Sequence, residues 1–252
     1  MPCFRRVIEI VTHGSRARGC ARVALEDDYH HFRVSLEYRN RFITRATGDA
    51  LRTPYDLCRD ATIGLGLLRG MALETDADVV LNHIDRRQQC THMFDEAGLA
   101  VAAVTRNIRQ RRYEIEVPRH VRGATRPRLW RDDDLLLDWQ VEDGVIVSPA
   151  PFAAVNLGKG MARWALDNLG PDEAEAAIVL RRCSLISQGR LRNLDLESNA
   201  SVTGRCFVQQ PERAKRASRV KKSTLDFTNC KERLCAGDQS WLSESSLNCQ
   251  AP

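Results

Sequence analysis

The sequence contains no apolar run long enough to cross a bilayer, and its first residues, Met-Pro-Cys-Phe-Arg-Arg, lack the apolar core of a signal peptide. We therefore expect a protein of the cytosol with no membrane segment. The strand–helix–strand rhythm of a parallel sheet is also missing. A dedicated groove for a polyanion is not indicated, because the net charge is only +5 and the arginines are interleaved with acidic residues.

The nine cysteines are irregularly spaced, and their odd number excludes complete internal pairing. In a chain without an export signal we expect such cysteines to be thiols or metal ligands rather than a disulfide framework. The last three, Cys230, Cys235 and Cys249, lack the paired Cys-x-x-Cys spacing of a zinc ribbon. They lie in a Ser/Asn/Gln-rich tail, residues 229–252, which we expect to be poorly ordered.

The chain is 252 residues long and 43% hydrophobic, which is enough for one large domain with a substantial core. We predict a single domain over residues 1–228. A Gly/Pro/Arg-rich connection offers an alternative, in which two lobes meet near residues 118–128.

Alternating apolar and polar residues predict β-strands, and apolar residues three and four apart predict helices. Strands are predicted at 5–12, 32–38, 42–46 and 111–117, and helices at 53–70, 91–104 and 172–188. The second and third strands are joined by a tight connection and form a β-hairpin. We therefore predict an α+β fold in which antiparallel β-hairpins pack against helices.

A thiol and an imidazole two residues apart, Cys90 and His92, open the predicted helix 91–104. Thr91 is a suitable N-cap for this helix. The unpaired N–H groups at a helix start stabilise a thiolate, so a cysteine in the place of Cys90 can be more acidic than a free one. The alternative is a buried thiol beside a histidine that hydrogen-bonds to the backbone.

Two acidic residues and two histidines, Asp27-Asp28-Tyr29-His30-His31, stand at the entrance of the predicted hairpin. In an extended chain His30 and His31 point to opposite faces, so we expect one near the core and one toward solvent. Either acid is a candidate partner for a histidine or merely a turn former.

Cys58 lies on the apolar stripe of the predicted helix 53–70, near the end where the helix dipole is positive. It is therefore a candidate ligand. The alternative is a small buried hydrophobic residue.

The order of these motifs resembles a bacterial protein family catalogued as domain of unknown function 2889. The matching residues are Asp27, Asp28, His30, His31, Phe32, Arg52, Pro54, Tyr55, Cys58, Leu68, Gly70, Cys90, Thr91 and His92. Further similarity follows in Glu175-Ala176-Ala177, Leu180-Arg181-Arg182, Cys206 and Gln210-Pro211, so that the likeness spans most of residues 5–228. The resemblance implies no particular reaction. A local likeness over residues 30–70, a hairpin followed by a cysteine at a helix start, is similar to iron–sulfur scaffold and sulfur-acceptor folds.

We expect an enzyme that acts on a small organic molecule through a Cys/His/Asp site, a metal- or thiol-dependent lyase or hydrolase. The candidate catalytic residues are Cys90, His92 and Asp28. The candidate ligands for zinc or iron are His30, His31, Cys58, Cys90 and His92. Without a metal, Cys90 is the expected nucleophile and a histidine its base.

Two other classes of function stay open at this point. In one, an iron–sulfur or sulfur-carrier protein, Cys58, Cys90 and Cys206 converge. In the other, a nucleic-acid-binding module, the basic runs at 106–112 and 213–222 contact the phosphates. The second class is disfavoured because neither run carries the aromatic residues that stack on bases.

Overall fold

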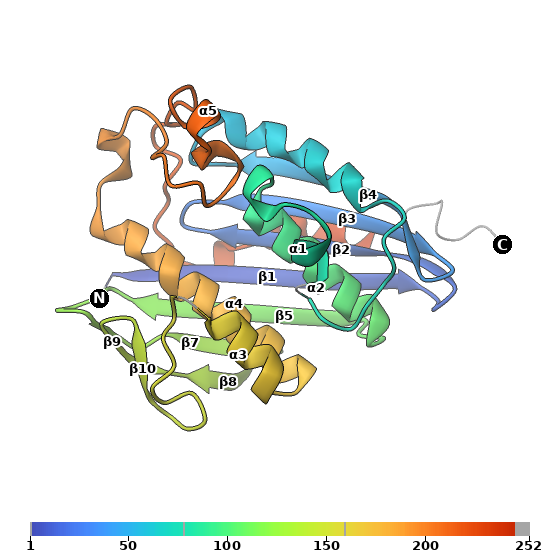
Figure 1. The fold of residues 1–252 in the computed structure, drawn as a ribbon, viewed down its shortest axis with the longest axis horizontal. Coiled ribbons are helices and arrows are strands. Elements are labelled where there is room, and N and C mark those ends of the chain that lie inside the picture. Colours follow the sequence, from blue (N-terminus) through green and yellow to red (C-terminus); the bar gives the residue numbers. More distant parts are fainter. Residues whose placement is uncertain (1, 78, 159, 245–252) are drawn as a thin grey trace.

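A seven-stranded antiparallel sheet forms the centre of the protein, as seen in the computed structural model (Figure 1). The structure describes residues 2–77, 79–158 and 160–244. In the sheet the strand order is β4-β3-β2-β1-β5-β7-β8. The strands are β1 (Cys3–Gly14), β2 (Arg18–Asp27), β3 (His31–Arg39), β4 (Phe42–Arg52), β5 (Gln110–Pro118), β7 (Arg128–Arg131) and β8 (Asp134–Asp138).

A small three-stranded sheet and several helices complete the fold. The small sheet has the order β10-β9-β6, with β6 (Ala124–Thr125), β9 (Gln140–Glu142) and β10 (Val145–Ser148). The α-helices are α1 (Val79–His83), α2 (Thr91–Thr105), α3 (Met161–Asn168), α4 (Pro171–Ile186), α5 (Pro211–Ala214) and α6 (Gln239–Ser243). The 3₁₀ helices are η1 (Asp56–Leu68), η2 (Arg86–Gln88), η3 (Ser187–Leu191), η4 (Leu194–Leu196), η5 (Phe207–Gln209), η6 (Lys231–Arg233) and η7 (Ala236–Asp238). This architecture confirms the predicted α+β class.

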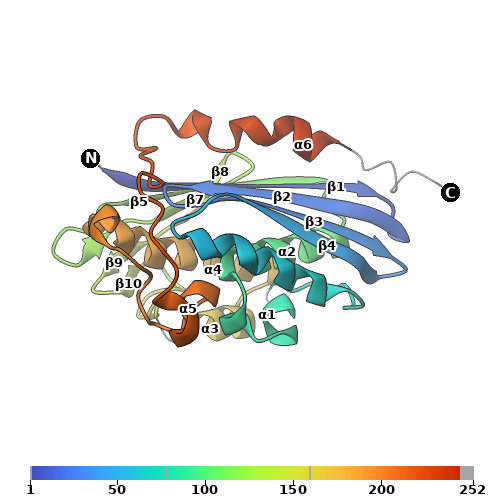
Figure 2. The same cartoon turned by 90° about the horizontal axis from the view of Figure 1, so that it is seen from above.

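The elements form three layers (Figure 2). Helices α2 and α4 and the 3₁₀ helix η1 cover one face of the large sheet, and the C-terminal segment that ends in α6 lies on the other. The main core lies between the sheet and α2 and α4, where Phe4, Phe32 and Phe94 are almost completely buried. Because the strands are pleated, one face of β1 and β2 packs in this core while the other face packs under the C-terminal segment.

The C-terminal segment is ordered over residues 229–244, so the prediction of a poorly ordered tail is wrong there. Phe227, Leu234 and Leu242 are buried against Val7 and Ala24 on the second face of the sheet. The cause is long-range burial, which a polar local composition does not reveal. Residues 245–252, with Cys249, lie outside the described residues.

Helix α2 confirms the helix predicted at 91–104, but its N-cap is Cys90 rather than Thr91. The apolar stripe predicted on the helix at 53–70 is also confirmed, since Cys58, Leu65 and Leu68 of η1 are buried. Gly70, with φ of +86°, ends this segment in the left-handed region that favours glycine.

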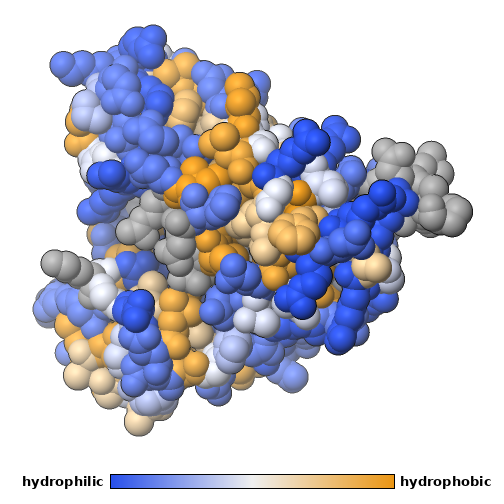
Figure 3. Space-filling model, turned by 45° about the vertical axis from the view of Figure 1, so that its right-hand side comes forward, coloured by the Kyte–Doolittle hydropathy of each residue, from blue (hydrophilic) through white to orange (hydrophobic). Residues whose placement is uncertain are grey.

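The face drawn in Figure 3 is largely hydrophilic, with hydrophobic side chains that reach the surface toward its middle. Two large apolar side chains of η1, Ile63 and Leu67, are exposed. None of the helices in the described part of the chain has the length and apolar character required to span a bilayer.

Candidate functional site

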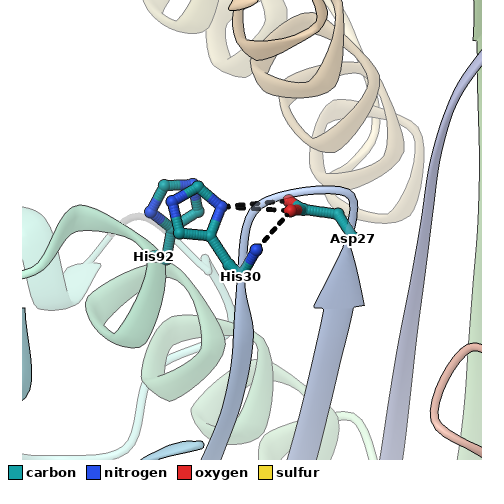
Figure 4. A group of neighbouring side chains, drawn as sticks. All are labelled: Asp27, His30 and His92. Atoms are coloured by element: carbon teal, nitrogen blue, oxygen red, sulfur yellow. Dashed lines mark hydrogen bonds and ion pairs between the residues drawn. The ribbon is translucent and has the colours of Figure 1, made fainter. Parts of the chain in front are cut away.

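Three side chains meet where the β2–β3 turn faces the start of α2: Asp27, His30 and His92 (Figure 4). One ligand-type atom from each lies within 4.8 Å of the other two. The imidazole rings of His30 and His92 have centroids 4.0 Å apart and planes tilted by 33°. Among the described residues, no other set of three His, Cys, Asp or Glu side chains meets this distance criterion.

The turn between β2 and β3 fixes the position of His30 relative to Asp27. The Asp27 backbone N–H donates to the His30 carbonyl oxygen at 2.8 Å, which closes the turn. Asp27 Oδ1 accepts the backbone N–H groups of Tyr29 and His30, each at 2.7 Å. His30 Nδ1 lies 3.1 Å from Asp27 Oδ1 and 3.3 Å from Oδ2. Asp27 therefore shapes the turn and also orients the imidazole.

Arg6 of β1 holds the other side of the Asp27 carboxylate. Its Nε donates to Asp27 Oδ2 at 2.9 Å, and its Nη2 donates to the same oxygen. Arg6 is 2% exposed and Asp27 is completely buried. Burial by itself raises the pKa of Asp27, but Arg6 and then His30 outweigh it and bring the pKa well below its usual range. Asp27 is consequently an ionised carboxylate in a buried place.

His92 presents a neutral imidazole to this carboxylate. Burial, followed by the nearby His30 and Arg6, lowers the pKa of His92 well below its usual range. Its Nε2 atom is buried and has no hydrogen-bond partner among the described residues. A neutral imidazole with an unused nitrogen is the form that binds a metal ion.

The separations fit a metal ion as well as they fit hydrogen bonds. Zinc lies about 2.0–2.1 Å from a histidine nitrogen, so two ligand atoms at neighbouring corners of a tetrahedron lie about 3.3 Å apart. The distances of 3.1 and 3.3 Å from His30 Nδ1 to the Asp27 oxygens are close to this value. Two histidines and one carboxylate are also the ligand set of mononuclear non-haem iron(II) sites.

Asp28 and His31 do not join this group. The Asp28 carboxylate is paired with Arg190, whose Nε lies 2.6 Å from Oδ2. His31 points to the opposite face of the sheet, as its parity predicts, and its Nε2 lies 2.9 Å from Asp238 Oδ2 of the C-terminal segment. The expectation that His31 is a ligand of the same metal as His30 is therefore wrong, because the sheet separates the two rings. The acid that meets His30 and His92 is Asp27 rather than Asp28.

Cys90 and Cys58 are buried thiols rather than activated nucleophiles. Burial raises the pKa of Cys90 well above its usual range, although the Met93 and His92 backbone N–H groups act in the opposite direction. Of the two alternatives for Cys90, the structure favours the buried thiol over the acidic one, since burial outweighs the helix start. Burial also raises the pKa of Cys58 to about 12.

Cys206 lies near these two cysteines, because the segment that follows it is tied to the residue before Cys90. The Phe207 backbone N–H donates to the Gln89 carbonyl oxygen at 3.0 Å. Burial raises the pKa of Cys206 too. Among the described residues, the Sγ atoms of Cys58, Cys90 and Cys206 lie too far apart to bind one ion together.

A pocket that opens to solvent lies between β1, β2, α2 and α4 next to this site. Arg6 connects the two, since it lines the pocket and also donates to Asp27. The polar lining residues are Arg6, Asp76, Asp95, Glu96, Glu175 and Arg182. The apolar lining residues are Ile8, Leu25, Ala77, Leu99, Leu166, Pro171, Ile178 and Val179.

Sequence reasoning missed Arg6 and Glu96. For Arg6 a signal exists, because Phe4, Ile8 and Ile10 occupy the same face of β1 and are all buried, which leaves an arginine on a core-facing position. Glu96 falls in the apolar helix between Met93 and Leu99, and it is completely buried. A charged residue at a core position of a strand or helix is the pattern that would have identified both.

Three arginines of the two basic runs form ion pairs within the fold. Arg106 and Arg111 both pair with Asp172 and Glu175. Arg219 pairs with Asp195 at 3.0 Å. These contacts neutralise side chains that a nucleic-acid groove would keep free.

Comparisons of the chain with protein-family models, with curated proteins and with solved structures find no match.

Proposed function

We propose that the protein is a metal-dependent enzyme of the cytosol that acts on a small organic molecule, a hydrolase or lyase whose zinc or iron(II) ion is held by Asp27, His30 and His92. The resemblance to the domain of unknown function 2889 family supplies no reaction, so the proposal rests on the site. The observation that carries it is the convergence of three ligand atoms within 4.8 Å in a buried place beside a pocket.

The ligand set suits catalysis because it is incomplete. Three protein ligands leave at least one position of a zinc or iron(II) ion for water or substrate. An ion held by Asp27, His30 and His92 would polarise a carbonyl group or lower the pKa of a bound water. Cysteine thiolates are absent from the set, and the raised pKa values of Cys58 and Cys90 argue against a thiol nucleophile.

Neighbouring groups of the protein hold the three ligand side chains in the ionisation state and orientation that bind a metal ion. Arg6 keeps Asp27 ionised, and the two backbone N–H groups of the turn fix the orientation of its carboxylate. His92 is neutral before any ion arrives, so it has no proton to release on binding. Arg6 satisfies one carboxylate oxygen in the manner of the outer partners that tune many metal sites.

A second candidate is acid–base catalysis without a metal. The observation that favours it is the contact of 3.1 Å between His30 Nδ1 and Asp27 Oδ1, which places the proton on Nδ1 and leaves Nε2 as a base. The two candidates differ in the partner of His30 Nδ1, a proton in one and a metal ion in the other.

Metal titration separates these candidates. The protein is stripped with a chelator, dialysed against zinc or anaerobic iron(II), and analysed for bound metal. The proposal predicts one ion per chain in the wild-type protein and none in His30→Ala or His92→Ala. Stoichiometric binding that survives both substitutions, or none in the wild type, contradicts it.

His31→Ala is the matched control, because it removes the neighbouring histidine from the other face of the sheet. It should keep one ion per chain. The acid–base alternative predicts activity that survives chelation, once a substrate is found.

A further inference from the structure

Glu96 of α2 is the least satisfied charged group of the described chain on its side of the sheet. Its side chain is completely buried, and neither carboxylate oxygen has a hydrogen-bond partner among the described residues. Burying a carboxyl group without a partner costs several kcal/mol on the usual scales, so native proteins rarely leave one in this condition. Glu96 lines the pocket between α2 and α4.

The other charges of the pocket decide which kind of ligand Glu96 can take. The cations of the lining are Arg6 and Arg182, and each is already paired, Arg6 with Asp27 and Arg182 with Asp95 at 2.7 Å. Glu175 is paired with Arg106 and Arg111. The remaining acidic groups are Glu96 and the exposed Asp76, so the lining has acidic side chains to spare but no unpaired cation.

The rest of the wall is aliphatic. Leu25, Leu99 and Val179 are buried and line the pocket beside Glu96. A ligand that matches this wall has an aliphatic body and one hydrogen-bond-donating cationic group. Asp76 is exposed and lines the same pocket, so the pocket meets solvent on its side.

We propose that this pocket binds a small aliphatic compound with a primary ammonium group, whose N–H groups donate to both oxygens of Glu96. An ammonium has three N–H donors, which is enough to satisfy Glu96 and one further acceptor. The aliphatic part of the ligand lies against Leu25, Leu99 and Val179. In the complex the ammonium group takes the place of the proton that the buried carboxyl group otherwise keeps, so Glu96 is ionised when the ligand is bound.

The position of Glu96 makes this compound the substrate class of the metal centre, a step that rests on the proposed function. Glu96 follows His92 by four residues on α2, and residues so spaced lie on one face of a helix, about 5–6 Å apart at their Cβ atoms. Arg6 touches both places. An ion held by Asp27, His30 and His92 would therefore share Arg6 and one face of α2 with the bound ammonium compound.

The experiment is calorimetric titration of the full-length protein with three probes of equal length: n-butylammonium, butyrate and 1-butanol. We expect saturable binding of n-butylammonium and at least tenfold weaker binding of the other two. Tighter binding of butyrate, equal binding of all three, or no binding of n-butylammonium at millimolar concentration overturns the proposal. This comparison uses unmodified protein and needs no variant.

Glu96→Gln then locates the site, because the substitution keeps the shape of the side chain and removes its charge. We expect n-butylammonium affinity to fall at least tenfold, whereas Asp76→Asn at the exposed edge should change it less than threefold. Unchanged affinity in Glu96→Gln overturns the assignment to this pocket.

The titration is run on both chelator-treated and metal-loaded protein, so that the two proposals fail separately. Binding of n-butylammonium to the metal-free protein supports the pocket whatever the metal analysis shows. If n-butylammonium binds but no metal does, the ammonium site stands and its assignment as the substrate site of a metal centre is overturned.

Discussion

The imidazole rings of His30 and His92 lie against each other at a centroid distance of 4.0 Å, although one ring comes from a β-turn and the other from the first turn of a helix. Two rings this close repel each other if both are protonated. Burial, then His30 and Arg6, lower the pKa of His92. The pair is therefore not two cations, because His92 is neutral.

His92→Phe tests the ligand role while it preserves the ring packing. The phenyl ring can stack on His30 as the imidazole does, but it offers no nitrogen. We predict that the fold is retained, with a circular dichroism spectrum like that of the wild type, and that metal affinity falls by more than the roughly 10- to 100-fold that loss of an outer partner causes. His31→Phe on the opposite face should leave the affinity within a factor of two. Equal affinities in the two variants contradict the ligand role.

Asp27→Asn should destabilise the protein strongly, because it leaves the guanidinium of Arg6 buried without its counter-charge. Breaking a buried ion pair on one side costs roughly 3–5 kcal/mol. Urea denaturation measures the loss in the free energy of unfolding. The double variant Arg6→Met/Asp27→Asn should regain a large part of it, since no buried charge is then left unpaired. A double variant less stable than Asp27→Asn contradicts the pairing.

Glu96 should make the stability of the protein fall as pH rises. Burial, with smaller contributions from Asp95, Asp238 and Asp27, raises its pKa well above the usual range, although Arg6 opposes the shift. The unfolded chain releases this proton near pH 4.3 and the folded protein only at higher pH. Between these values the folded state binds more protons, so the free energy of unfolding decreases with rising pH until the folded pKa is passed.

Glu96→Gln has no such proton, and its stability should therefore vary less over the same range. The difference in unfolding free energy between wild type and variant is measured at pH 5 and pH 8. The contributions of the other titratable groups are common to both proteins and cancel in this difference. Each unit by which the pKa is raised contributes about 1.4 kcal/mol to the change in that difference. A difference that is the same at both pH values contradicts the buried, protonated carboxyl group.

Gly98→Ala should disturb the pocket wall formed by the segment that crosses α2. A Cβ atom at Gly98 would overlap the carbonyl oxygen of Ala77, and a backbone oxygen cannot turn aside as a side chain can. We predict a loss of 1 kcal/mol or more in unfolding free energy, within the usual range of about 1–3 kcal/mol for overpacked sites. Gly66→Ala is the control, since a Cβ atom there meets no atom within 4 Å. Equal stability of the two variants contradicts the close approach at Gly98.

Cys58 and Cys90 should react slowly with a thiol reagent in the folded protein. Both are buried and their pKa values are raised, so little thiolate is present at neutral pH. Mass spectrometry after brief alkylation should find them unmodified, and all nine cysteines modified in urea. Rapid labelling of Cys90 in the folded state would contradict this prediction and support Cys90 as a nucleophile.

Local periodicity was sufficient to predict much of the fold. The alternation from Phe32 to Tyr38 and the three- and four-residue spacing after His92 each correspond to a regular element. The same alternation placed His30 and His31 on opposite faces, and the structure confirms this. Patterns of this kind are read from neighbours in sequence, so they require no knowledge of long-range packing.

The parts that failed depend on contacts between distant residues. Asp27 and Asp28 are adjacent acids, and only the hydrogen bonds of the turn determine which one faces His30. The pKa of Cys90 depends on burial by distant segments, which overrides the helix start. The C-terminal segment looks like a loose end because its few apolar residues, such as Leu234 and Leu242, find their partners on strands more than two hundred residues earlier.

X-ray absorption spectroscopy of the zinc-loaded protein tests the central claim most directly, because it identifies the atoms bound to the ion. Nitrogen and oxygen ligands lie at about 2.0–2.2 Å from zinc and sulfur at about 2.3 Å. The ligand set Asp27, His30 and His92 predicts two imidazole nitrogens, one carboxylate oxygen and no sulfur. It also predicts the loss of one imidazole in His92→Phe. Sulfur in the first shell, or a spectrum unchanged by the loss of His92, would show that the metal binds elsewhere and that the proposed centre is wrong.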